Sequence, residues 1–190
     1  MQFTRHTNLA GLHAPFSPSQ SSWLRYDEDK LLEVYSNKKA AEYGSRIHAW
    51  AAETIKLGMK QPKSTKTIPS YINDAIGFKM EPEVVLFYSE RFFGTADAIS
   101  FRKNKEGRWL LRIHDLKTGK NQAKMEQLKV YAALFCLEYG YKPGDIDIEL
   151  RLYQNDEVIY HVPTADEIAP IMDKIIYFDK LLEKMDKEEG

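Results

Sequence analysis

Three segments in the middle of the chain change the hydrophobic pattern from helical spacing to that of β-strands. They are rich in β-branched and aromatic residues and span residues 84–88, 92–101 and 109–116. The polar sequence Lys103-Asn104-Lys105-Glu106-Gly107 between the last two predicts a hairpin turn. Further strand and helix patterns follow, so the order of elements predicts an α/β fold with a mixed β-sheet flanked by helices.

Helices are expected on both sides of these strands, because apolar residues there recur at helical spacing. The expected order is a helical N-terminal part at 1–60, a sheet core at 83–162 with a helix at 121–139, and a C-terminal helix at 164–187. A chain of 190 residues with 43% hydrophobic content can bury one sizeable core. We therefore expect a single domain over residues 1–190.

Composition argues against several kinds of site. The single cysteine, Cys136, excludes an internal disulfide and a four-cysteine zinc or iron–sulfur site made by this chain alone. One cysteine fits a reducing, cytoplasmic compartment. No stretch has the length of a membrane span, and the N-terminus lacks the apolar region of a signal peptide. The net charge of −1 is not the basic balance of many nucleic-acid-binding proteins, but bound cations would offset acidic metal ligands.

Two carboxylates and a lysine lie in neighbouring expected strands. Asp97 follows Gly94 in one strand, whereas Asp115 and Lys117 leave the same face of the next. Pairing across the hairpin would bring Asp97 near Asp115. Carboxylates among apolar residues are costly to bury without a cation, so the pattern predicts a divalent metal ion, and the lysine indicates phosphate chemistry. The alternative for Asp97 is a solvent-facing side chain or a pair with Arg112.

Two other residues are candidates for the same site. His48 lies in an expected helix among small residues, where it is a candidate metal ligand. A purely structural histidine is the alternative interpretation. Glu90 lies at the end of the strand before Asp97, and its alternative is a surface glutamate that keeps the hairpin in solution.

The helix expected after Lys117 has a polar side. Its members are spaced by four, three and four residues and are Lys120, Lys124, Gln127 and Tyr131. Two lysines, an amide and a phenol suit contact with a phosphate backbone. An ordinary exposed helix face is the alternative.

Taken in order, these residues resemble the RecB-like branch of the PD-(D/E)xK nuclease superfamily. The segments that carry the resemblance are His48, Glu90, Gly94-Thr95-Ala96-Asp97, Asp115-Leu116-Lys117-Thr118-Gly119 and Gln127-Leu128-Lys129-Val130-Tyr131. The resemblance implies a restriction-endonuclease-like core, with a central mixed sheet flanked by helices and an N-terminal helical segment. It also implies a deoxyribonuclease that depends on Mg²⁺ or Mn²⁺.

The resemblance further implies roles for individual residues. The implied metal ligands are His48, Asp97, Asp115 and the Leu116 carbonyl. The implied catalytic residues are Asp97, Asp115 and Lys117, of which Lys117 would orient or activate water. The implied substrate contacts are Gln127 and Tyr131, to which the sequence adds Lys120 and Lys124. Many relatives hold an iron–sulfur cluster with four cysteines, whereas the single Cys136 predicts no cluster here.

The implied activity is that of a stand-alone exonuclease of phage or prophage type. It would process DNA ends in recombination or repair, in a bacterial or phage-infected cell. A structure-specific or restriction-type endonuclease is one alternative, and a DNA-binding module that has lost cleavage is another. DNA is the expected partner, with a recombination protein as a second partner and no membrane contact.

Overall fold

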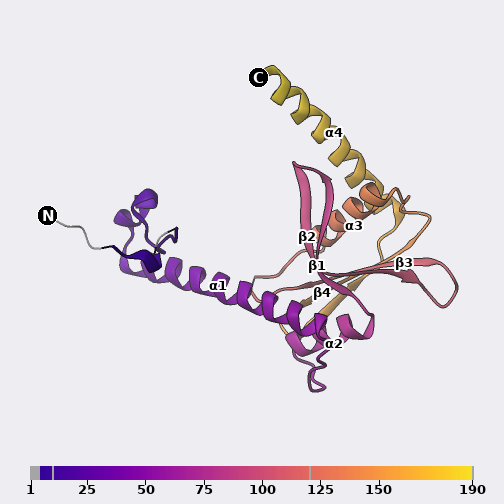
Figure 1. Cartoon of the computed structure of the whole chain (residues 1–190), viewed down its shortest axis with the longest axis horizontal. Helices are drawn as coiled ribbons and strands as arrows, with labels where there is room; N and C mark the ends of the chain where they lie inside the picture. The colour runs from indigo at the N-terminus through magenta and orange to yellow at the C-terminus, as the bar shows by residue number, and fades with distance from the viewer. Residues whose placement is uncertain (1–4, 10, 120, 190) are drawn as a thin grey trace. The chain divides into compact units, whose positions relative to one another are not determined.

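Figure 1 shows the chain as a computed structural model. The residues that it describes are 5–9, 11–119 and 121–189. The chain divides into two compact units, Met1–Ser45 and Arg46–Gly190. The expectation that the whole chain folds as one domain stays a prediction.

The first unit is helical, as expected for this part of the chain. It contains the short 3-10 helices η1 (Thr7–Leu9) and η2 (Pro18–Arg25) and the first part of α1 (Glu28–Lys56). Asp27 precedes α1, and its carboxylate accepts a hydrogen bond from the backbone N–H of Lys30 at 2.8 Å. An aspartate at this position satisfies a free N–H group of the first turn, which explains where α1 begins.

The second unit is built on one sheet of five strands. The strands are β1 (Glu81–Ser89), β2 (Phe92–Lys103), β3 (Trp109–Leu116), β4 (Asp147–Gln154) and β5 (Glu157–His161). Their order in the sheet is the order in the chain. β3 and β4 are parallel, and the other neighbouring pairs are antiparallel. The sheet is therefore mixed, which confirms the predicted α/β class.

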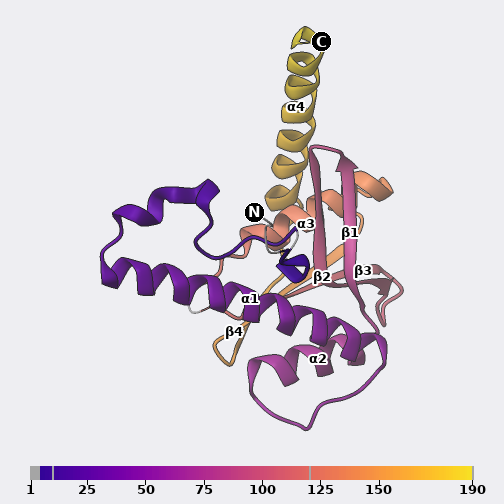
Figure 2. The same ribbon diagram turned by 60° about the vertical axis from the view of Figure 1, so that its left-hand side comes forward.

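Helices pack on both faces of this sheet. α2 (Thr67–Gly77) precedes the sheet, α3 (Glu126–Tyr139) connects β3 to β4, and α4 (Ala165–Glu189) follows β5. Leu128 of α3 belongs to a buried cluster that also includes residues of α4, whereas Ile72 of α2 belongs to a second cluster. α2 and α3 lie on opposite sides of the sheet (Figure 2). Burial on both faces explains the nearly continuous apolar runs in the central strands.

The segment between β3 and α3 is held in a non-helical conformation by one buried side chain. The amide of Gln154 donates hydrogen bonds to the carbonyl oxygens of Gly119 and Asn121, both at 2.7 Å. Its oxygen accepts one from the Ala123 N–H at 2.9 Å. α3 begins five residues later than the predicted start at residue 121, and the three hydrogen bonds to Gln154 hold Gly119, Asn121 and Ala123 ahead of the helix.

Gln154→Met should release this segment, because methionine has a similar size and makes none of the three hydrogen bonds. We expect faster amide hydrogen exchange at Ala123 and a free energy of unfolding lower by about 3 kcal/mol, since three hydrogen bonds are lost and each contributes about 1 kcal/mol net. Urea unfolding and exchange measured by mass spectrometry check this. The control is Gln122→Met, an exposed position in the same segment. Equal exchange in both variants would contradict the prediction.

Within the described ranges, none of the helices combines the length and the apolar character needed to cross a bilayer.

Candidate metal centre

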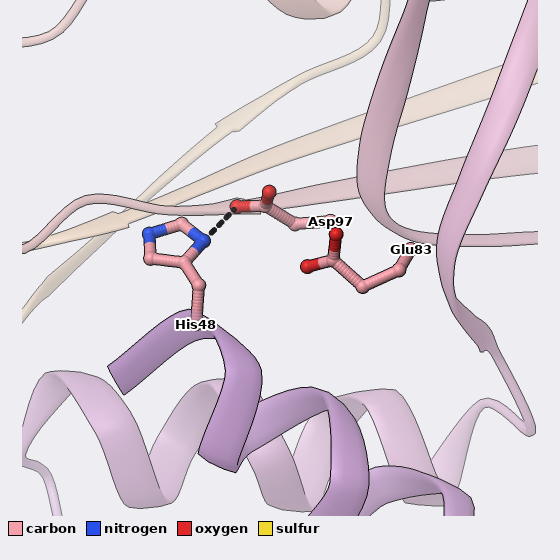
Figure 3. Close-up of side chains that lie close together, drawn as sticks. All are labelled: His48, Glu83 and Asp97. Carbon is pink, nitrogen blue, oxygen red and sulfur yellow. Dashed lines mark ion pairs between the residues drawn. The ribbon is translucent and has the colours of Figure 1, made fainter. Parts of the chain in front are cut away.

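Three side chains from α1, β1 and β2 converge beside the sheet (Figure 3). They belong to His48, Glu83 and Asp97, and each offers a ligand atom within 4.8 Å of the other two. Nδ1 of His48 lies 3.3 Å from Oδ2 of Asp97. The hydrogen bond to Asp97 and its negative charge raise the pKa of His48, against the effect of burial. Three ligand atoms this close together could hold a metal ion.

The strand register explains why these carboxylates meet. The pairing of β1 with β2 sets Glu83 across from Asp97. The pairing of β2 with β3, continued by one residue, sets Asp97 across from Asp115. Three carboxylates therefore occupy one row across three adjacent strands. Like charges directly opposite one another destabilise a sheet. A positive charge beside this row would offset the repulsion between the three carboxylates.

Asp115 is the most deeply buried of the three carboxylates, with 2% of its surface exposed. Burial, together with the negative charge of Asp97, raises its pKa to about 6, although Lys117 acts in the opposite direction. Lys117 Nζ lies 3.0 Å from Oδ2 and 3.3 Å from Oδ1. Among the described residues Oδ2 accepts no hydrogen bond. The Lys117 ammonium offsets part of the cost of burying this carboxylate, and a bound divalent cation would offset more.

The donor set fits a divalent cation. Carboxylate oxygens are the ligands that Mg²⁺ prefers, and the imidazole of His48 makes Mn²⁺ more favourable than an all-oxygen set would. Leu116 contributes through its backbone N–H, which donates a hydrogen bond to Oδ2 of Asp97 at 2.8 Å. This bond orients the Asp97 carboxylate. The proposed ligand role of the Leu116 carbonyl stays a prediction.

Lys117 is connected to α3 by a chain of hydrogen bonds. Its Nζ donates to Oε1 of Gln127 at 2.8 Å, and Nε2 of Gln127 donates to Oη of Tyr131 at 3.2 Å. The Tyr131 ring lies against Gly94, where an added Cβ would be 3.0 Å from Cε1. Glycine at this position therefore leaves space for the Tyr131 ring. From there the Tyr131 hydroxyl accepts the hydrogen bond from Gln127, which in turn accepts one from Lys117.

The other candidates from the sequence lie elsewhere. Glu90 is exposed in the turn between β1 and β2, seven residues along the chain from Glu83, and the structure does not bring it to the row of carboxylates. Lys124 is exposed in the segment before α3 rather than on the helix. Lys120 lies outside the described residues.

Glu83 is the member of the site that the sequence patterns missed. Its backbone φ of 56° is unusual for a residue other than glycine, and strained positions of this kind cluster at functional sites. Burial and the charge of Asp97 raise the pKa of its carboxyl. Counting back along the hairpin from the turn at Glu90 and Arg91 would set Val84 opposite Asp97. A β-bulge between Phe87 and Ser89 shifts the register by one residue and brings Glu83 there, so the turn alone does not reveal this ligand.

The sequence matches no family model, and no curated protein matches it. The functional argument therefore depends on the residues and their geometry.

The two glutamates of the β1–β2 region provide a direct test of the site. Glu83→Gln should weaken Mn²⁺ binding about 10-fold to 100-fold, because it removes one charged ligand, whereas Glu90→Gln should bind as wild type does. Isothermal titration calorimetry with MnCl₂ measures both. If Mn²⁺ binding were weaker in Glu90→Gln and unchanged in Glu83→Gln, then Glu90 rather than Glu83 would be the ligand.

Proposed function

We propose that this chain is a RecB-like nuclease, a divalent-metal-dependent enzyme that hydrolyses phosphodiester bonds in DNA. The observation that carries the proposal is the row of Glu83, Asp97 and Asp115 across three strands, with His48 at one end and Lys117 beside Asp115. A purely structural ion pair needs one acidic and one basic side chain, whereas five ionisable side chains gather here. A site that brings a cation and an ammonium group together suits an anionic phosphate substrate.

Each residue has a distinct part in this proposal. His48, Glu83, Asp97 and Asp115 would hold the ion. When bound, the ion supplies Lewis-acid activation of the phosphate and a more acidic water molecule. Lys117 Nζ orients the attacking water and stabilises the negative charge that develops on the phosphoryl oxygens.

Gln127 and Tyr131 act on Lys117 and on the substrate. The hydrogen bond from Lys117 to Gln127 fixes the ammonium beside Asp115, so less reorganisation is needed when the substrate binds. In this proposal Gln127 and Tyr131 also make the substrate contacts that the resemblance implies.

We further propose that the enzyme is an exonuclease acting on DNA ends in recombination or repair, in the cytoplasm of a bacterial or phage-infected cell. The test uses linear, circular and end-blocked DNA, both single- and double-stranded, with Mn²⁺, Mg²⁺ or EDTA. Cleavage of linear DNA alone supports the exonuclease. Cleavage of circles would replace it with an endonuclease. Binding without metal-dependent cleavage of any substrate would overturn the nuclease proposal.

A further inference from the structure

One face of the β1–β2 hairpin leads away from the metal centre and is exposed. The hairpin extends past the last pairing of β2 with β3, and Figures 1 and 2 show it projecting from the sheet. Side chains two residues apart along a strand share a face, and so do cross-strand partners. The residues on this face are Glu83, Val85 and Phe87 of β1 and Phe93, Thr95 and Asp97 of β2.

Two phenyl rings lie at the far end of this face. Phe87 and Phe93 are cross-strand partners with ring centroids 6.4 Å apart, and they are 45% and 60% exposed. Phe93 is four residues from Asp97, which corresponds to about 14 Å along a strand. The side chains between the rings and the carboxylates, Val85 and Thr95, are uncharged. An uncharged strip that ends in two phenyl rings, here called the platform, therefore leads away from the candidate catalytic centre.

We propose that Phe87 and Phe93 stack against unpaired bases of the strand whose phosphodiester is cleaved at the metal centre. This inference rests on the proposed function, and it names the substrate as a single-stranded segment. Aromatic side chains bind unpaired bases irrespective of sequence, whereas the bases of a duplex are stacked inside it. At the 3.4 Å spacing of a stacked strand, the distance to the rings spans about four nucleotides.

A protein occupant fits this face less well. A stable protein interface covers about 800 Å² per partner, far more than Val85 and two phenyl rings offer. β1 is an edge strand, but the N–H of Phe87 already donates to Oε2 of Glu138 at 2.8 Å, so strand addition is blocked at the platform itself. Bases require only the exposed ring faces.

The test compares two double variants on two substrates in Mn²⁺. Phe87→Ala/Phe93→Ala removes the platform, and Tyr177→Ala/Phe178→Ala removes a similar exposed aromatic pair from α4, with ring centroids 5.8 Å apart. The substrates are a single-stranded oligothymidine of about 12 nucleotides, within the usual range of single-strand sites, and thymidine 5′-p-nitrophenyl phosphate, which is too short to reach the rings. We expect the platform variant to raise the KM for the oligonucleotide about 10-fold to 100-fold. Its turnover of the small ester and both activities of the control should equal those of wild type.

A second measurement observes stacking without cleavage. In Phe93→Trp, oligothymidine added in Ca²⁺ should quench the additional tryptophan fluorescence, and affinity should equal that of wild type. Unchanged KM in the platform variant, or absence of quenching, would overturn the platform while the nuclease proposal stands. A change of oligomeric state in the platform variant, with unchanged KM, would instead assign the face to a second copy. If wild type cleaves neither substrate, the proposed function fails. The fluorescence quenching in Phe93→Trp then tests base stacking at the platform independently of cleavage.

Discussion

Asp115→Asn is expected to lower Mn²⁺-dependent DNA cleavage about 10³-fold without unfolding the protein. Asparagine keeps the size of the side chain but removes the charge that a divalent ion and Lys117 share. A metal that activates a phosphoryl group contributes several kcal/mol of transition-state stabilisation, and about 1.4 kcal/mol corresponds to a factor of ten in rate. The fold should persist, because the substitution removes a costly buried charge rather than an apolar contact.

Single-turnover cleavage of linear DNA measures this effect, with circular dichroism as the check on folding. Asp145→Asn is the matched control, since this aspartate is exposed before β4 and away from the row of carboxylates. We expect the control to cleave at the wild-type rate. If Asp115→Asn retained more than a tenth of that rate, its carboxylate would have no place among the metal ligands.

The residues that the sequence identifies are those whose positions follow from local rules. Asp115 lies near the end of β3 and Lys117 directly follows that strand, and a hairpin turn joins β3 to the strand with Asp97. Strand alternation and hairpin pairing are therefore enough to predict that they lie close together. Gln127 follows in the next helix, although the start of that helix was predicted five residues too early.

The residues that the sequence did not identify depend on tertiary contacts. Placing Glu83 in the site requires the exact register of β1 against β2. The periodicity of apolar residues does not reveal that register. The late start of α3 depends on Gln154, which lies more than thirty residues from the backbone groups that it binds. Contacts at such separation leave no local signal in one sequence, so only the folded structure reveals them.

A buried polar network behind the candidate site is a further example. His114 is fully buried, and burial lowers its pKa. Its Nδ1 lies 3.2 Å from Oη of Tyr153, which donates to Oδ2 of Asp74 at 2.7 Å. Since His114 and Asp115 are consecutive in a strand, their side chains leave opposite faces. The network therefore supports the strand from the α2 side, while the carboxylate of Asp115 faces Lys117.

The same buried carboxylate predicts how the stability of the metal-free protein depends on pH. The pKa of Asp115 is raised from 3.8 to about 6, so the folded state binds this proton more tightly than the unfolded chain does. Its contribution is therefore fully present below pH 4 and is lost as the pH rises through 6. A shift of this size corresponds to about 3 kcal/mol. The raised pKa values of Glu83 and His48 act in the same direction.

Urea unfolding at pH 5 and pH 7.5, in EDTA or in Mn²⁺, measures this dependence. Wild type in EDTA should be less stable at the higher pH, and Mn²⁺ at 100 times its dissociation constant should restore about 2.7 kcal/mol there, because it binds the deprotonated carboxylates of the folded state. Asp115→Asn should show a smaller loss between the two pH values and a smaller gain from Mn²⁺. A full response to Mn²⁺ in this variant would mean that the ion binds without Asp115, and the buried charge would then have a structural role only.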